Sequence, residues 1–445
     1  MTAKAATTWR NGGLADLVEP GRVHASVYTS PEIFAAEMDR IFGRAWIFVA
    51  HDSQLRNAGD FLRTRMGRHE VLVTRSADGR FHVLTNSCAH RGARLCAAEA
   101  GNAETFFCPY HAWGFRNDGA LLRVPHPASY PSDFAADDGS HDLRRAPRVD
   151  AYRGFVFASW AEDGPGLAEF LSPMTEAIDN LVDRAPGGEI EIAGGRFRLL
   201  YRGNWKLHHE NANDTVHPGF VHESSVTTAR ESPEGEMIDQ GQAKAMMAAN
   251  GFSVREWQGI DLYGFERGHS YMGGFYKNGL LAPSANDPVL AEYRAALEAA
   301  RGKDAADRIL GMDRFNNLIY PNLSVNAQYH QIRIVHPISA NRTEVHSYCF
   351  RLKGAPDGIF RRAVRFLSTL SSPASLIFGD DVEVFERVQQ GLETGGVEWL
   401  NVERGLGGDV PMEGSAGGLS SQAASELPVR AQMRAWQAYM SEAAE

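Results

Sequence analysis

Two short pairs of metal-binding residue types near residue 100 constrain this chain more than any other feature. The first pair is Cys88-x-His90 and the second is Cys108-x-x-His111, with seventeen residues between them. Two thiolates and two imidazoles in one short segment indicate a bound metal. The chain holds only four Cys among 445 residues, so chance is a poor explanation for this spacing.

Two kinds of metal site use two Cys and two His. A zinc site usually has Cys-x-x-Cys followed by a pair of His, so that each pair contains one residue type. In this chain each pair mixes one Cys with one His. That arrangement suits a Rieske [2Fe–2S] centre, in which one iron takes both Cys, the other takes both His, and each loop delivers one ligand to each iron. We therefore predict a Rieske cluster held by Cys88, His90, Cys108 and His111.

The length and composition predict two or three globular domains. The net charge of −10 at pH 7 argues against a general binder of nucleic acid or membrane surfaces, which would be basic. The sequence contains no apolar run of about 18 residues and no recognisable secretory leader. Four Cys, two of them expected iron ligands, fit a reducing compartment. We therefore expect a cytoplasmic protein without nucleic-acid or membrane partners.

The hydrophobic pattern divides the chain into three parts. Residues 1–44 form an N-terminal helical segment, with a helix over 31–43 that Ser30 can cap and Pro31 can start. Residues 45–160 contain short runs of β-branched and aromatic residues separated by turns, such as Ala77-Asp78-Gly79, and predict a small β domain. Residues 161–445 form the remaining domain. Its predicted elements are helices over 286–311, 357–392 and 426–443, strands within 319–350, and a loop over 403–425.

A second group of metal-binding residue types lies in the stretch HHENANDTVHPGFVH, residues 208–222. It contains Asp214, His217 and His222 in the spacing Asp-x-x-His-x₄-His. On a helix Asp214 and His217 share a face. Pro218 disfavours the α conformation at His217, so the helix should bend or stop there and bring His222 beside His217. Two His with one carboxylate from elsewhere form the facial triad of mononuclear Fe(II) oxygenases.

The residues alone do not decide whether Asp380 or Asp381 supplies the carboxylate of this triad, and both residues could instead cap a helix. His208 and His209 are rival ligands by proximity, but we expect them to point away from the iron and to support it or fill the core. Arg333 and His336 lie on a strand-like stretch that could line the pocket, and either could face an anionic group.

These residues together resemble the large (α) subunit of Rieske non-haem iron aromatic-ring-hydroxylating dioxygenases. The resemblance covers most of the chain, from RAWIFVAHDSQLRNAGDF through CAHRGA, CPYHAW and ENANDTVHPGFVH to GDDVEVFERVQQGL. It implies an α+β fold, in which an N-terminal Rieske-type small β domain precedes a C-terminal catalytic domain of helices and antiparallel sheet with helix-grip, START-like topology. Residues 1–44 would pack on that catalytic domain.

The resemblance also implies site residues. His217, His222 and Asp381 would bind the mononuclear iron, and Asp381 is preferred over Asp380 because Glu and Gln follow it by five and nine residues, as in the family. Asp214 would be an electron-transfer bridge that bonds His217 and, in the neighbouring subunit, His111. The residues expected at the substrate pocket are Glu210, Asn211, Arg333 and Ile377.

The implied activity is that of a terminal oxygenase. It would use O₂ and electrons from NAD(P)H, delivered by a reductase or a ferredoxin, to cis-dihydroxylate an aromatic ring. The segments YPNLSVNAQYHQIRIVHP and DDVEVFERVQQGL are most similar to oxygenases of aromatic carboxylates of the anthranilate, salicylate or benzoate type. An α₃ trimer or an α₃β₃ assembly with a small β subunit is implied. A Rieske monooxygenase or demethylase would share both metal motifs and is the alternative.

Overall fold

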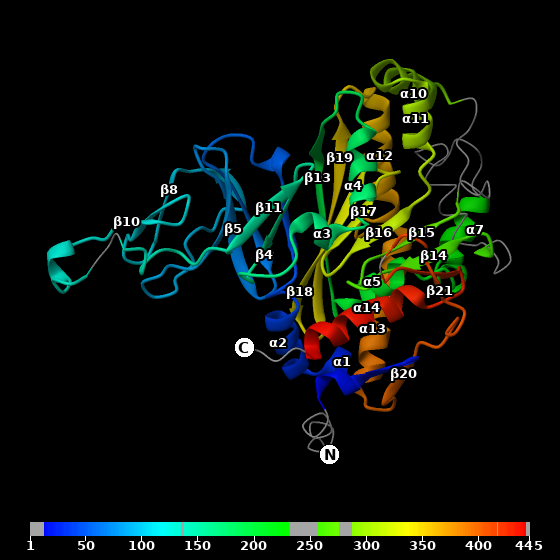
Figure 1. Cartoon of the computed structure of the whole chain (residues 1–445), viewed down its shortest axis with the longest axis horizontal. Helices are drawn as coiled ribbons and strands as arrows, with labels where there is room; N and C mark the ends of the chain where they lie inside the picture. The colour runs from blue at the N-terminus through cyan, green and yellow to red at the C-terminus, as the bar shows by residue number, and fades with distance from the viewer. Residues whose placement is uncertain (1–12, 135–137, 232–256, 276–286, 416, 442–445) are drawn as a thin grey trace. The chain divides into compact units, whose positions relative to one another are not determined.

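The computed structural model describes residues 13–134, 138–231, 257–275, 287–415 and 417–441 of the chain (Figure 1). The chain divides into two compact units, one of residues 42–170 and one that joins residues 1–41 to residues 171–445. The boundaries expected at 44/45 and 160/161 stay a prediction. Within the described part of the chain, no helix has the length and apolar character needed to cross a membrane.

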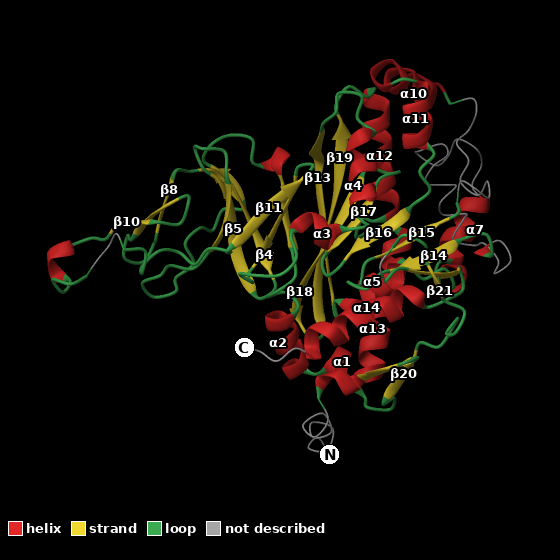
Figure 2. Cartoon of the chain, viewed as in Figure 1, coloured by secondary structure: helices red, strands yellow, loops and turns green. Residues whose placement is uncertain are grey.

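The unit of residues 42–170 consists of three small antiparallel sheets (Figure 2). Their strand orders are β6-β5-β4-β7, β10-β9-β8 and β11-β12-β3. The strands are β3 (Ile47–His51), β4 (Asp60–Met66), β5 (His69–Arg75), β6 (Phe81–Thr85), β7 (Ala100–Asn102), β8 (Thr105–Phe107), β9 (Gly114–Arg116), β10 (Leu121–Arg123), β11 (Arg148–Tyr152) and β12 (Phe155–Ser159). The predicted small β domain is confirmed.

Local chemistry explains how these strands turn and pack. The predicted turn between β5 and β6 forms with Gly79 at φ 83°, a left-handed conformation that glycine adopts without strain. The strands enclose a core that includes Leu72, Leu84, Phe106 and Phe115, together with Cys88 and Cys108. The two Cys therefore belong to the core of this unit, which fixes the loops that carry them.

The larger unit is organised around a nine-stranded antiparallel sheet with the order β13-β19-β18-β17-β16-β15-β14-β22-β21. Its strands are β13 (Ile190–Tyr201), β14 (Asp261–Gly264), β15 (Ser270–Gly273), β16 (Phe315–Ile319), β17 (Leu323–Asn326), β18 (Gln331–Ser339), β19 (Arg342–Leu352), β21 (Val410–Pro411) and β22 (Leu419–Gln422). The loop predicted over 403–425 is wrong in part, because β22 pairs with the distant strand β14. A second sheet of order β1-β2-β20 contains β1 (Val18–Glu19), β2 (Arg22–His24) and β20 (Trp399–Asn401).

Helices accompany this sheet, and α12 lies against β19 (Figure 1). Their bounds are α1 (Ser26–Thr29), α2 (Pro31–Arg40), α4 (Thr175–Asp183), α5 (Lys206–Ala212), α6 (Pro218–Val221), α7 (Glu223–Glu231), α10 (Pro288–Arg301), α11 (Lys303–Leu310), α12 (Asp357–Leu370), α13 (Leu376–Glu393) and α14 (Leu427–Ser441). Helix α3 (Leu167–Leu171) ends the unit of residues 42–170. Pro31 starts α2 and the Ser30 side chain accepts from the Ile33 amide at 3.1 Å, as predicted. The helices and antiparallel sheet confirm the predicted α+β class.

Two long predicted helices are each split. The helix expected over 286–311 breaks at Gly302, which has φ 82°. The helix expected over 357–392 breaks between Leu370 and Leu376, in a segment that contains Pro373. Proline lacks the amide that would continue the hydrogen-bond ladder, and Ser375 then caps the new helix by accepting from the Phe378 amide at 3.1 Å.

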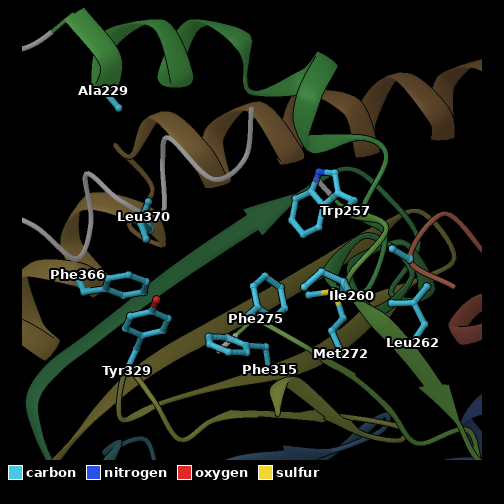
Figure 3. Packing of buried hydrophobic residues seen from close by; sticks show 11 residues of the cluster. Ala229, Trp257, Ile260, Leu262, Met272, Phe275, Phe315, Tyr329, Phe366 and Leu370 are labelled. Atoms are coloured by element: carbon cyan, nitrogen blue, oxygen red, sulfur yellow. The ribbon is translucent and has the colours of Figure 1, made fainter. Parts of the chain in front are cut away.

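A large apolar cluster of the bigger unit gathers side chains from the sheet and from the helices (Figure 3). Phe366 from α12 stacks on Tyr329, with 3.7 Å between ring centroids and 8° between ring planes. Phe275 and Phe315 make a second aromatic contact at 4.4 Å. These buried rings form much of the wall of the cavity described below.

Candidate metal centres

The two Cys–His loops of the smaller unit share one backbone pattern. The carbonyl of Cys88 accepts from the Gly92 amide at 2.8 Å, and that of Cys108 accepts from the Ala112 amide at 3.0 Å. Each Cys amide also donates, at 2.8 Å, to the carbonyl five residues later. Gly92 and Ala112 are both left-handed, with φ 69° and 53°. The two loops are therefore equivalent, and each presents one Cys and one His.

The side chains of the four predicted ligands meet between these loops. The thiols of Cys88 and Cys108 are buried, and burial together with the neighbouring Cys108 raises the pKa of the Cys88 thiol. The rings of His90 and His111 lie 4.7 Å apart. Within the described residues the Nδ1 atom of each ring is buried without a hydrogen-bond partner. The Trp113 ring stacks on His90 at 4.9 Å and covers it.

This donor set fits a two-iron cluster better than a single zinc ion. Four ligands of one zinc would lie within about 4.6 Å of one another, because each zinc–ligand bond is at most about 2.3 Å long. Across the described residues, the one group of three or more His, Cys, Asp or Glu whose ligand atoms all lie within 4.8 Å is His217, His222 and Asp381. The four ligands of the smaller unit are spread more widely, as two irons bridged by sulfide require.

The backbone around the second site differs from the prediction. Helix α5 ends at Ala212, so Asp214 and His217 do not share a continuous helix. The Asp214 carboxylate accepts from the amides of Val216 at 2.6 Å and His217 at 3.3 Å. His217 is right-handed α (φ −58°, ψ −34°), contrary to the expectation that Pro218 would disfavour this conformation. The capped turn holds it there, and Pro218 occupies the first position of α6, where proline is tolerated.

The two predicted His ligands and Asp381 converge. The Oδ1 atom of Asp381 lies 3.2 Å from His222 Nε2 and 3.6 Å from His217 Nε2. The Asn211 side-chain nitrogen lies 3.0 Å from the same oxygen and 3.0 Å from His217 Nε2. Burial would raise the pKa of Asp381, but its contacts with His217 and His222 outweigh burial and hold that pKa well below its ordinary value. A buried carboxylate and two imidazoles directed at one point fit a mononuclear iron.

Asp380 has a different place. Its Oδ2 atom lies 3.4 Å from Nδ1 of His222, the ring nitrogen that faces away from Asp381. The alternative that Asp380 and Asp381 cap a helix is wrong, because α13 begins earlier and Ser375 caps it. A carboxylate on the outer nitrogen of a metal-binding His orients the ring.

Asp214 lies beside His217 and has a partner that the sequence did not suggest. Its Oδ1 atom is 4.0 Å from His217 Nδ1. Its Oδ2 atom accepts from Arg404 Nη2 at 3.1 Å, and Arg404 also faces Glu426. No local pattern links positions 214 and 404, because 190 residues separate them.

A cavity of about 130 Å³ opens beside the His217–His222–Asp381 group. Of the residues expected at the pocket, Asn211, Arg333 and Ile377 line it and Glu210 does not. Sequence reasoning missed the aromatic and aliphatic wall, because its members come from separate strands and helices. That wall comprises Trp257, Met272, Phe275, Phe315, Tyr329, Phe366, Leu370 and Phe378.

The remaining polar residues of α5 point elsewhere. Glu210 accepts hydrogen bonds from the Tyr28 hydroxyl at 2.8 Å and from Gln432 at 3.1 Å. His209 Nε2 lies 2.8 Å from the Pro321 carbonyl. His208 is buried, with its ring 5.6 Å from that of Phe378. Neither His belongs to the group around Asp381.

Glu210 should make stability depend on pH. Burial raises its pKa to about 7, against the contrary effects of Tyr28, Lys206 and Gln432. The folded state therefore retains a proton that the unfolded chain releases above about pH 4.5, so the stability contributed by Glu210 falls as pH rises toward 7, by roughly 3 kcal/mol in all. The measurement is the difference between the unfolding midpoints at pH 5 and at pH 8. We expect this difference to be smaller in Glu210→Gln than in the wild type, and to be unchanged in Glu413→Gln, which alters an exposed residue. Equal differences in the wild type and both variants would contradict the raised pKa of Glu210.

Comparison with protein families finds two matches. Residues 45–136 match the Rieske [2Fe-2S] domain, and residues 189–442 match the catalytic domain of the ring-hydroxylating alpha subunit. Together the two matches contain all the residues of both candidate metal centres.

Individual proteins are similar over most of the chain. The alpha subunit of toluate 1,2-dioxygenase from Pseudomonas putida is 36% identical over 379 residues, which cover 84% of this chain and 80% of that protein. The large subunit of anthranilate 1,2-dioxygenase from Acinetobacter baylyi is 32% identical over 421 residues, covering 91% and 86%. A solved structure of naphthalene 1,2-dioxygenase with indole bound in the active site superimposes with a TM-score of 0.79 at 27% identity, covering 96% and 94%.

Proposed function

Because this chain belongs to the family of Rieske ring-hydroxylating oxygenase α subunits, we propose that it is the large subunit of a terminal oxygenase that cis-dihydroxylates an aromatic ring. The reaction consumes one O₂, two electrons and two protons, and it places both oxygen atoms on adjacent ring carbons. The observation that carries this proposal is the convergence of His217, His222 and Asp381 at the wall of an apolar cavity.

In this proposal, different residues of the chain hold the two metal centres, orient their ligands and form the substrate cavity. Cys88, His90, Cys108 and His111 hold the cluster, and His217, His222 and Asp381 hold the mononuclear iron. When bound, the cluster supplies electrons singly and the Fe(II) activates dioxygen. Asn211 and Asp380 orient these ligands through the contacts at 3.0 and 3.4 Å. The aromatic wall excludes water and positions the ring.

Asp214 would connect the two kinds of centre between neighbouring subunits, by bonding His217 in one and the partner's His111 in the next. Its Oδ1 atom lies 4.0 Å from His217 Nδ1, a buried atom without a hydrogen-bond partner among the described residues, and this position supports the first half of the bridge. Exposed Phe107 and Tyr110, beside the second cluster loop, suit contact with another subunit. A ring of three α subunits, alone or with a small β subunit, would allow this arrangement, with electrons reaching it from NAD(P)H through a reductase or ferredoxin.

The proposed substrate is an aromatic carboxylate with one ring. Two similar proteins carry the names of toluate and anthranilate dioxygenases. The cavity of about 130 Å³ is close in size to an apolar cavity of about 150 Å³ that accommodates benzene.

Isotope labelling tests the reaction type. The purified protein is reduced chemically under anaerobic conditions, mixed with benzoate and exposed to ¹⁸O₂, and the product is analysed by mass spectrometry. We expect two labelled atoms in one diol product. A product with a single labelled atom, the other atom of the dioxygen having been released as water, would instead assign a monooxygenase or demethylase. If no one-ring aromatic acid gave a labelled product, the proposed substrate class would be overturned.

A further inference from the structure

One basic side chain, that of Arg333, lies in the wall of the cavity and contacts no anionic group of the described residues. Arg333 lies on β18, where its neighbours in the sheet are Ser324 of β17 and Ser347 of β19. It is the sole Lys or Arg among the described residues that line the cavity. The same cavity is bordered by His217, His222 and Asp381, so any ligand beside the iron site is within reach of this wall.

The side chain of Arg333 is half-buried, and its guanidinium has no polar partner among the described residues. Within the described residues its side chain makes no hydrogen bond and no ion pair, and its closest aromatic contact is the Phe378 ring, 5.9 Å from the guanidinium carbon. Burial lowers the pKa of Arg333, opposed by the field of Asp381. An arginine nevertheless keeps its charge in a protein, so this wall of the cavity is cationic.

The acidic groups near the cavity already have other contacts. Asp381 faces His217, His222 and Asn211, and Asp214 is paired with Arg404. A divalent iron held by Asp381 would add positive charge to the same space. Because Arg333 has no anionic partner among the described residues, its charge can attract an anionic group of a ligand in the cavity.

The aromatic part of the wall favours a flat, apolar body for the rest of that ligand, and Asn316, Asn326 and Gln331 add polar groups to the lining. Phe275, Phe315, Tyr329 and Phe366 present aromatic rings to the cavity, and Ile377 lies beside them. Figure 3 shows the rings of Phe275, Phe315, Tyr329 and Phe366 lying near one another. A ligand that satisfies both features has one aromatic ring and one anionic substituent.

We propose that Arg333 is the residue that recognises the substrate carboxylate, pairing its planar guanidinium with both oxygens of an aromatic acid while the ring lies against the aromatic wall. This inference rests on the proposed function, because it assigns the acidic group of the substrate to the same cavity. Arg333 would then determine the preference of the enzyme for acidic over neutral substrates. By fixing the carboxylate, it would also determine which edge of the ring faces the iron site.

Binding measurements on the holoenzyme test this assignment without turnover. The dissociation constants of benzoate and of the neutral isostere benzamide are measured by anaerobic calorimetric titration for the wild type, Arg333→Gln and Arg333→Lys. We expect Arg333→Gln to weaken benzoate about 30-fold or more and benzamide less than about threefold, because only the acid loses a charge pair. Arg333→Lys should recover part of the benzoate affinity, since lysine keeps the charge but loses the bidentate geometry.

The matched control is Arg198→Gln, which removes the same charge from β13 of the same sheet at a side chain that is 51% exposed. It should leave both dissociation constants unchanged. The benzoate-to-benzamide ratio within one variant does not depend on the folded fraction, and Arg333→Lys supplies that ratio if Arg333→Gln does not fold. An unchanged ratio in the Arg333 variants would overturn the assignment. The titration uses neither O₂ nor electrons, so its outcome is independent of the labelling result that tests the reaction.

Discussion

Replacing Asp381 with alanine should abolish ring oxidation and empty the mononuclear iron site while the Rieske cluster remains. In the described part of the chain, Asp381 supplies the one carboxylate whose oxygen faces both His217 and His222, at 3.6 and 3.2 Å. Loss of a residue that merely orients a ligand costs about 10–100-fold in metal affinity or activity, so loss of the ligand itself should exceed 100-fold. Metal analysis should fall from about three irons per chain to about two, with the EPR signal of the reduced cluster unchanged.

Asp380→Asn is the matched control, because it changes the adjacent carboxylate, 3.4 Å from the outer nitrogen of His222. This variant should retain its third iron when Fe(II) is supplied in excess, with activity reduced by at most about 100-fold. If Asp380→Asn emptied the site and Asp381→Ala did not, the ligand assignment would pass to Asp380. Loss of the cluster signal in Asp381→Ala would show instead that the substitution disturbs more than one site.

Local sequence was sufficient where local chemistry decides the structure. The Ser30 cap with Pro31 starts α2, and the turn at Ala77-Asp78-Gly79 joins two strands as predicted. The cluster loops were predictable in the same way, because the spaced Cys and His residues and the left-handed Gly92 lie in one short segment. The hydrophobic pattern also predicted the small β domain, whereas the α+β class of the whole chain came from the family resemblance.

Contacts between distant positions were not predictable. The residues alone did not decide between Asp380 and Asp381 as the iron ligand, and the preference for Asp381 came from the family resemblance. In the structure, the direction of each carboxylate depends on where α13 begins. The pairing of Arg404 with Asp214 joins positions 190 residues apart. Glu210 was expected at the pocket because it flanks the predicted iron ligands in the sequence. Adjacent residues on a helix face different directions, however, and Glu210 contacts Tyr28 and Gln432.

Removing one member of the buried Glu37–Lys206 pair should destabilise the larger unit by about 3–5 kcal/mol. Both side chains are fully buried, and Lys206 Nζ lies 2.5 Å from Glu37 Oε1. Glu37 also accepts from the indole nitrogens of Trp205 at 2.9 Å and Trp436 at 2.7 Å. The carboxylate of α2 therefore connects the start of α5 to the C-terminal helix α14, and α5 leads directly to Asn211 and the metal-binding turn.

The substitution Lys206→Met keeps the length of the side chain but leaves Glu37 as an uncompensated buried charge. We expect its apparent free energy of unfolding, measured by urea titration followed by circular dichroism, to fall by the full 3–5 kcal/mol. The double variant Lys206→Met with Glu37→Gln should recover part of that loss, because the amide oxygen can still accept from a Trp indole and no charge remains buried.

The corresponding surface change is Lys353→Met, which breaks the ion pair with Glu189, where the side chains are 42% and 67% exposed. An exposed pair contributes at most about 1 kcal/mol, so this variant should unfold almost as the wild type does. Similar losses of unfolding free energy for Lys206→Met and Lys353→Met would mean that burial does not increase the contribution of an ion pair to stability. A double variant less stable than Lys206→Met would show that the hydrogen bonds from Trp205 and Trp436 to the Glu37 carboxylate outweigh the cost of its buried charge.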